Sequence, residues 1–211
     1  MNQKTKAIIE ILIIVLLFIS LSYIIQTNIE SIRNIIGDGY DSMLFYILMT
    51  VVAVVIAPIS ATPLLPLASN LWGWLIAAIL SIIGWTIGSL IAFVLARIYG
   101  LLIIRKFIPI ERIRDIEKKI PDENIFWSIV FLRMILPVDL LSYALGIFSK
   151  INTRDYLLAT IIGVAPFAFV FAYLGEMPIL YQIISFLIAM IILLIGFIIK
   201  KIRDKKKIKK R

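Results

Sequence analysis

The sequence has 211 residues, of which 62% are hydrophobic, and a formal net charge of +9. This composition is too apolar for a protein with a water-facing surface, and it predicts an integral membrane protein with one domain. The chain has no cysteine and no histidine, which excludes disulfides, thiolate chemistry, His-ligated metals and a Ser-His-Asp triad.

The first predicted element is residues 7–25, an apolar run that follows Lys4 and Lys6. The run is long enough to span a membrane and lacks the small-residue cleavage pattern of a signal peptide, so we expect a signal-anchor helix. Residues 26–41 form a polar segment with one basic residue, Arg33. This distribution of basic residues places the N-terminus in the cytoplasm and the polar segment outside.

Residues 43–73 begin as a helix and then contain three prolines, Pro58, Pro63 and Pro66. Proline lacks a backbone N–H and clashes with the preceding turn, so a straight spanning helix cannot contain all three. Broken backbone at membrane depth is tolerated only where protein or a water-filled cavity satisfies its polar groups. We therefore expect a re-entrant segment, with the three prolines setting its shape.

Residues 74–96 form a predicted span, in which Gly84 and Gly88 have the spacing that lets two helices approach closely. The segment 97–123 carries seven basic residues interleaved with acidic ones. Its isoleucines recur at helical spacing, which favours an amphipathic helix on the membrane surface. A short soluble loop helix is the alternative.

Residues 124–152 are apolar but carry Arg133, Pro137 and Asp139 in their middle. A charged side chain at the centre of a bilayer costs about 2.5 to 3.5 kcal/mol on insertion scales, so these two charges should face protein or water. Pro137 frees a backbone carbonyl, which also needs a partner. The pattern predicts a second re-entrant segment that lines a polar site.

Residues 155–175 form the next predicted span, interrupted by Gly163 and Pro166, and residues 178–199 form the last one. The tail 200–211 has nine basic residues in twelve positions. Such a tail is typical of a cytoplasmic anchor that also contacts anionic lipid headgroups. Nothing outside the tail supports nucleic-acid binding, so we expect no nucleic-acid partner.

Two topologies keep both termini in the cytoplasm. If all six apolar segments cross, the basic segment 97–123 lies outside; if segments 43–73 and 124–152 are re-entrant, it lies inside, as the positive-inside rule favours. The predicted fold is therefore an all-α membrane protein, a small helical bundle with four spanning helices. Its two opposed re-entrant hairpins would form an inverted repeat with a site at the midplane. The expected organisation is an anchor over 1–42, a core over 43–176, and a last helix with the tail over 177–211.

Several motifs in this core resemble those of the DedA/VTT superfamily, also called the SNARE-associated Golgi protein domain. They are a broken proline segment before Trp72-Gly73, then FVLARIYG at 93–100, FLRMILP at 131–137, DLLSYALG at 139–146 and IGVAP at 162–166, with Gly175 after them. The resemblance covers residues 58–176. It implies two facing re-entrant hairpins, a role in moving lipids between leaflets, and a functional arginine at Arg133. Bacterial relatives are associated with polyprenyl-phosphate or phosphatidylethanolamine, and eukaryotic ones with phospholipid scrambling.

Two features depart from the family pattern. Residues 56–70 contain no acidic residue, although many members carry one in the first re-entrant segment. The sequence after Arg133 runs Pro-Val-Asp, without the Pro-Gly or second-arginine pattern of typical bacterial members. The chain is closer to the branch with Asp-Leu-x-Ser/Asn-Tyr at this point.

Arg133 is the main candidate for binding a substrate. A guanidinium stays charged and offers a planar fork of donors that suits a phosphate group. The alternative is a structural pair with Asp139, which requires a break at Pro137 because six residues along a continuous helix do not share a face. Asp139 is also a candidate for proton coupling, because desolvation would raise its pKa and pairing with Arg133 would lower it.

Other candidate site residues are less specific. Ser142 and Tyr143 are expected to hydrogen-bond freed backbone groups or headgroup oxygens, or, for Tyr143, to lie in an interfacial belt. Arg97 is a substrate candidate through its motif, although a helix-end arginine commonly extends to the interface. We expect Pro58, Pro63, Pro66, Pro137, Gly146, Gly163 and Pro166 to set the shape of the core.

The leading functional prediction is a lipid translocase of the cell membrane that moves a phospholipid or polyprenyl phosphate past Arg133. A secondary transporter of a small anion or ion is the alternative, because an inverted repeat with a midplane arginine fits both. A third class is a membrane assembly protein without transport activity. Enzyme activity is not expected, because the residues offer no nucleophile with a base and no metal site, and no cofactor is implied.

Overall fold

The computed structural model describes residues 3–56, 60–104, 124–135 and 138–192, and in these residues it contains helices and no strand. The chain divides into two compact units, Met1–Glu176 and Met177–Arg211. The second unit contains one short apolar helix, Ile179–Ile192. Residues 97–104 of the predicted surface segment belong to the helix that begins at Trp74. Residues 105–123, the end of the predicted last span and the basic tail lie outside the described residues.

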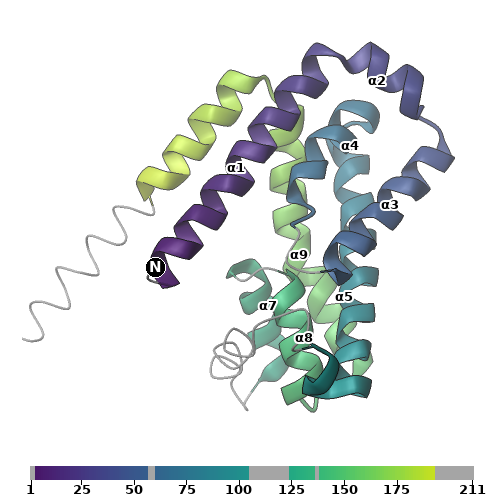
Figure 1. Cartoon of the computed structure of the whole chain (residues 1–211), viewed down its shortest axis with the longest axis vertical. Coiled ribbons are helices and arrows are strands. Elements are labelled where there is room, and N and C mark those ends of the chain that lie inside the picture. Colours follow the sequence, from purple (N-terminus) through teal and green to yellow (C-terminus); the bar gives the residue numbers. More distant parts are fainter. Residues whose placement is uncertain (1–2, 57–59, 105–123, 136–137, 193–211) are drawn as a thin grey trace, which may run out of the picture. The chain divides into compact units, whose positions relative to one another are not determined.

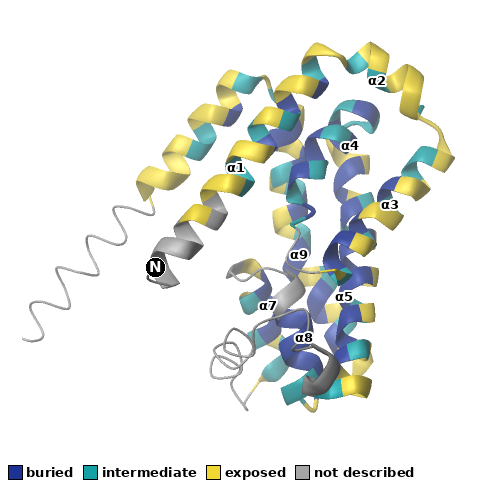
Figure 2. Ribbon diagram, in the orientation of Figure 1, coloured by how far each residue is buried: buried dark blue, intermediate teal, exposed yellow. Residues whose placement is uncertain are grey.

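The first unit begins with α1 (Gln3–Thr27), which includes the predicted anchor, and α2 (Ile29–Ile36). The part of α1 from Leu12 to Thr27 and α2 are bent by 88° relative to each other. No residue of α2 is buried, and Figure 2 shows this exposure along the helix. The bend separates a helix of membrane length from a short amphipathic one.

The first broken element consists of α3 (Tyr40–Val55), a 3₁₀ turn η1 (Thr62–Leu64) and α4 (Leu65–Trp72). Its two ends lie together, because the Trp72 indole Nε1 donates to the carbonyl oxygen of Asp38 at 3.1 Å. The Tyr46 and Trp72 rings also meet edge to face at 5.7 Å. The chain therefore runs away from this contact along α3 and comes back to it along α4.

Pro63 and Pro66 lie in the first turns of η1 and α4. The missing N–H of proline costs nothing at the start of a helix, because that N–H would have no helical partner. These two prolines therefore begin the returning arm. The break itself falls between Val55 and Thr62, and Pro58 lies there, outside the described residues.

Two helices are long and apolar enough to cross a membrane, namely the Trp74–Gly100 part of α5 (Trp74–Ile104) and α9 (Thr153–Glu176). A third span is present if the bent α1–α2 pair counts as one. Gly73, with φ of 80°, makes the turn between α4 and α5, a conformation that glycine adopts without steric cost. The sequence predicted four spans, and the described residues support two or three of them.

The second broken element consists of α7 (Ile125–Ile135) and α8 (Val138–Phe148). Both arms contribute to one buried cluster with the last turns of α5 and the start of α9, including Ile129, Leu145 and Phe93. Figure 1 shows α7 and α8 at the opposite end of α5 from α4. Each broken element thus packs against one end of the antiparallel pair α5 and α9.

Gly146 and Gly163 hold the second element close to these two helices. A Cβ on Gly163 would lie 2.7 Å from the Cβ of Arg133 and 3.0 Å from the Val130 carbonyl oxygen. A Cβ on Gly146 would overlap Ala96 and the Phe93 backbone. Only glycine permits this separation, so the positions expected to shape the core fix α7 against α9 and α8 against α5.

Candidate functional site

Arg133 lies in the last turn of α7 and is 3% exposed. Its Nη1 donates to Ser89 Oγ at 3.4 Å, and its Nη2 donates to Ser142 Oγ at 3.2 Å and to Tyr156 Oη at 2.6 Å. These residues come from α5, α7, α8 and α9, and together they are the Arg133 cluster. The cluster joins all four helices at one buried guanidinium.

Tyr156 orients this cluster. It is fully buried, and its hydroxyl donates to the Ser89 carbonyl oxygen at 2.9 Å, so that the oxygen accepts from Arg133. The ring stacks on Phe93 at a centroid distance of 4.0 Å. The Arg133 Cζ lies 5.3 Å from the ring centroid, which adds a cation–π contact. Sequence reasoning did not find Tyr156 or Ser89, because both are uncharged and each lies on a different helix from Arg133.

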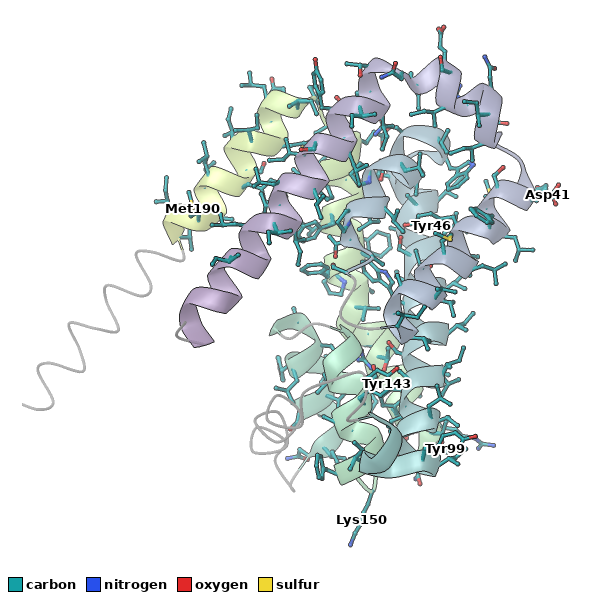
Figure 3. The ribbon with its side chains drawn as sticks, in the orientation of Figure 1. Asp41, Tyr46, Tyr99, Tyr143, Lys150 and Met190 are labelled. Atoms are coloured by element: carbon teal, nitrogen blue, oxygen red, sulfur yellow. The ribbon has the colours of Figure 1, made fainter. Side chains whose placement is uncertain are left out.

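Tyr143 connects the two broken elements. Its hydroxyl donates to the carbonyl oxygen of Val55 at 2.5 Å, and Val55 is the last residue of α3. That carbonyl lies at the end of a helix and lacks a helical donor. Figure 3 shows Tyr143 between the levels of Asp41 and Lys150, and nearer to Lys150. Tyr143 thus hydrogen-bonds a freed backbone group, one of the two roles considered for it.

Arg97 lies at the far end of α5 from the first element. Its Nη1 and Nη2 donate to the carbonyl oxygens of Ile151 and Ser149 at 2.9 and 2.7 Å, and its Cζ lies 4.4 Å from the Phe93 centroid. These carbonyls follow the C-terminus of α8. Arg97 therefore ties the second broken element to α5, and the structure does not bring it to the Arg133 cluster.

Glu176 makes the corresponding contact at the other end. Its Oε2 accepts from the backbone N–H of Trp74 at 2.8 Å, at the start of α5, and Asn70 Nδ2 donates to the Gly175 carbonyl oxygen at 2.9 Å. The end of α9 therefore binds the residues where α4 is followed by α5. In the same way, Arg97 of α5 binds the residues where α8 is followed by α9.

A constant separation of 79 residues relates the two halves. It separates the first residues of α5 and α9. It also separates residues of matching position, namely Pro58 from Pro137, Ser81 from Thr160, Gly84 from Gly163, and Arg97 from Glu176. Arg97 and Glu176 each contact the opposite half, whereas Gly84 and Gly163 each contact the broken element of their own half. Residues at matching positions therefore make corresponding contacts in the two halves.

An apolar depression lies on the surface beside the Arg133 cluster. It has a volume of about 190 Å³ and is lined by Met134, Pro166, Phe167 and Val170. Met134 follows Arg133 in α7, and Pro166 lies one turn after Gly163 in α9. Its walls are hydrocarbon, which suits an apolar chain and not a charged solute.

Three of the predicted site residues are not placed. The positions of Pro58 and Pro137 and the side chain of Asp139 lie outside the described residues, so the predicted Arg133–Asp139 pair stays a prediction. Among the described residues, no group of three acidic side chains could hold a metal ion.

Comparison with known protein families finds one match, the VTT domain, over residues 47–177. This range contains most of the first broken element, all of the second, α5 and α9, and therefore the whole Arg133 cluster. No curated protein and no solved structure matches the chain.

Proposed function

The chain belongs to the DedA/VTT superfamily, and from this premise we propose that it is a membrane lipid translocase that moves a phosphate-bearing lipid between leaflets. Its apolar helices and its VTT domain make it a membrane protein of that family. The moved lipid would be a phospholipid or a polyprenyl phosphate in the cell membrane. The proposal names Arg133 as the residue that binds the phosphate.

The proposed topology has two re-entrant hairpins that enter the membrane from opposite sides and meet near its middle. Three observations support it: each broken element packs at one end of α5 and α9, Arg97 and Glu176 hold matching junctions, and Tyr143 bonds to Val55 where the elements meet. Discontinuous helices of inverted repeats commonly form midplane substrate sites. In this proposal four helices cross and both termini are cytoplasmic.

The observation that carries the proposal is the chemistry around Arg133. The hydroxyls of Ser89, Ser142 and Tyr156 are among the acceptors of its hydrogen bonds. A phosphate carries the opposite charge to the guanidinium and can accept two parallel hydrogen bonds from it, which a hydroxyl cannot. A lipid phosphate would therefore replace these hydroxyls as the partner of the guanidinium, and the hydroxyls would take the phosphate's place after it leaves.

The apolar depression favours a lipid over a small anion. Met134, Pro166, Phe167 and Val170 form a hydrocarbon surface next to the helix turn that carries Arg133. A lipid has an apolar chain for this surface and a phosphate for the guanidinium, whereas a small anion uses only the guanidinium. An assembly protein without transport activity would need neither.

Reconstitution of the purified protein into liposomes tests the proposal. Fluorescent phospholipid or polyprenyl phosphate is placed in the inner leaflet, and an impermeant quencher is added outside. We expect the wild-type protein to expose the inner-leaflet label to the quencher, and protein-free liposomes to keep it protected. Failure to move any phospholipid or polyprenyl phosphate contradicts the proposal, and uptake of free phosphate instead favours the anion transporter.

A further inference from the structure

Thr86 is a buried hydroxyl in the middle of α5. It is 7% exposed, and its Oγ1 has no hydrogen-bond partner among the residues that the structure describes. Buried side-chain hydroxyls nearly always have a partner, since the alternative leaves a desolvated polar atom. A threonine that served only the fold would be expected to have such a partner, and Thr86 has none among the described residues.

Other buried serine and threonine hydroxyls in the unit donate to a backbone carbonyl oxygen of their own helix. Ser81 donates to Ala77 at 2.7 Å, Thr160 to Tyr156 at 2.7 Å, Ser69 to Leu65 at 2.8 Å and Thr50 to Ile47 at 2.8 Å. This bond is open to any serine or threonine in a helix. The Thr86 hydroxyl does not make this bond.

The position of Thr86 relates it to the Arg133 cluster. It precedes Ser89 by three residues and Phe93 by seven, so the three share one face of α5. Ser89 accepts from Arg133, and Phe93 stacks on Tyr156. Residues three apart on a helix have Cβ atoms roughly 5 to 6 Å apart. A phosphate group spans this distance, with one oxygen at the guanidinium and another at the threonine.

We propose that Thr86 is a further substrate-binding residue, whose hydroxyl donates to a phosphate oxygen of the ligand bound by Arg133. This inference rests on the proposed function. The ligand supplies the acceptor that the described part of the chain does not. The site then favours phosphate over a ligand with a single acceptor atom, because Arg133 binds one phosphate oxygen and Thr86 binds another.

The test compares Thr86→Val, Thr86→Ser and the control Thr50→Val. Thr50 is also a buried threonine on a helix, but its hydroxyl has a partner. In proteoliposomes we expect Thr86→Val to slow leaflet exchange of the labelled lipid about tenfold, the value of one hydrogen bond. Thr86→Ser and Thr50→Val should exchange lipid at nearly the wild-type rate. In thermal unfolding without added lipid, Thr86→Val should melt at or above the wild-type temperature, and Thr50→Val below it.

The outcomes separate this inference from the function on which it rests. If the wild-type protein moves lipid and Thr86→Val moves it equally fast, the role of Thr86 is wrong and the translocase stands. A lower melting temperature for Thr86→Val also overturns the inference, because the hydroxyl then has a partner within the protein. If the wild-type protein takes up inorganic phosphate but moves no lipid, and Thr86→Val slows that uptake, Thr86 is supported and the lipid proposal is wrong. Movement of neither ligand overturns both.

Discussion

Replacing Arg133 with lysine is expected to slow lipid exchange at least about tenfold, and replacing it with alanine should abolish exchange. The guanidinium reaches Ser89, Ser142 and Tyr156 from two nitrogens in one plane. A lysine ammonium is a single point charge, so it cannot bind two phosphate oxygens in the same fork geometry. The measurement is the exchange rate in proteoliposomes, with thermal unfolding as a check that the lysine variant is folded.

Arg154→Lys is the matched control. Arg154 is exposed near the start of α9, so the same chemical change should leave both exchange and unfolding at wild-type values. An Arg133→Lys protein that exchanges lipid as fast as the wild type would contradict phosphate binding by a fork. It would favour a structural role for Arg133, as expected of an assembly protein.

Gly163→Ala is expected to destabilise the protein by about 1 to 3 kcal/mol, the usual cost of overpacking a tight contact. The added Cβ would lie 2.7 Å from the Arg133 Cβ and 3.0 Å from the Val130 carbonyl oxygen, both on α7. Moving α7 away from α9 would also draw Arg133 from Tyr156. We therefore expect a lower melting temperature together with slower lipid exchange.

Gly39→Ala is the control for this change. Gly39 precedes α3, has φ of −80° and has no atom within 4 Å of an added Cβ, so alanine fits there without strain. Equal stability of Gly163→Ala and the wild-type protein would show that α7 and α9 are not in close contact. The Arg133 cluster would then have a different arrangement.

The sequence predicted the helical fold and the main spans because their signals are local. A long apolar run such as α9 is readable without knowing its neighbours. The match of the VTT domain confirms the family predicted from the motifs. The roles of Pro63 and Pro66 could not be predicted exactly. From the sequence alone, a proline that ends one helix cannot be distinguished from a proline that begins the next.

The site was predicted through Arg133, whose charge stands out in an apolar segment, and through Ser142, which follows it in the same segment. Ser89 and Tyr156 resemble ordinary helix residues, and only the packing of α5 and α7 against α9 brings them to the guanidinium. Arg97 shows the reverse case. Its motif suggested substrate binding, but the helix end on which it lies brings it to the backbone of Ser149 and Ile151.

The central claim is that two broken elements enter the membrane from opposite sides and meet where Tyr143 bonds to Val55. Asp41 lies before the first element and Lys150 after the second, both are exposed, and Figure 3 shows them at opposite ends of the unit. The chain has no cysteine, so Asp41→Cys and Lys150→Cys each create a single labelling site. The most direct measurement is labelling of these two variants in intact and opened cells with a membrane-impermeant maleimide. We expect Asp41→Cys to react in intact cells and Lys150→Cys to react only after the membrane is opened; reaction of both variants from the same side would contradict the claim.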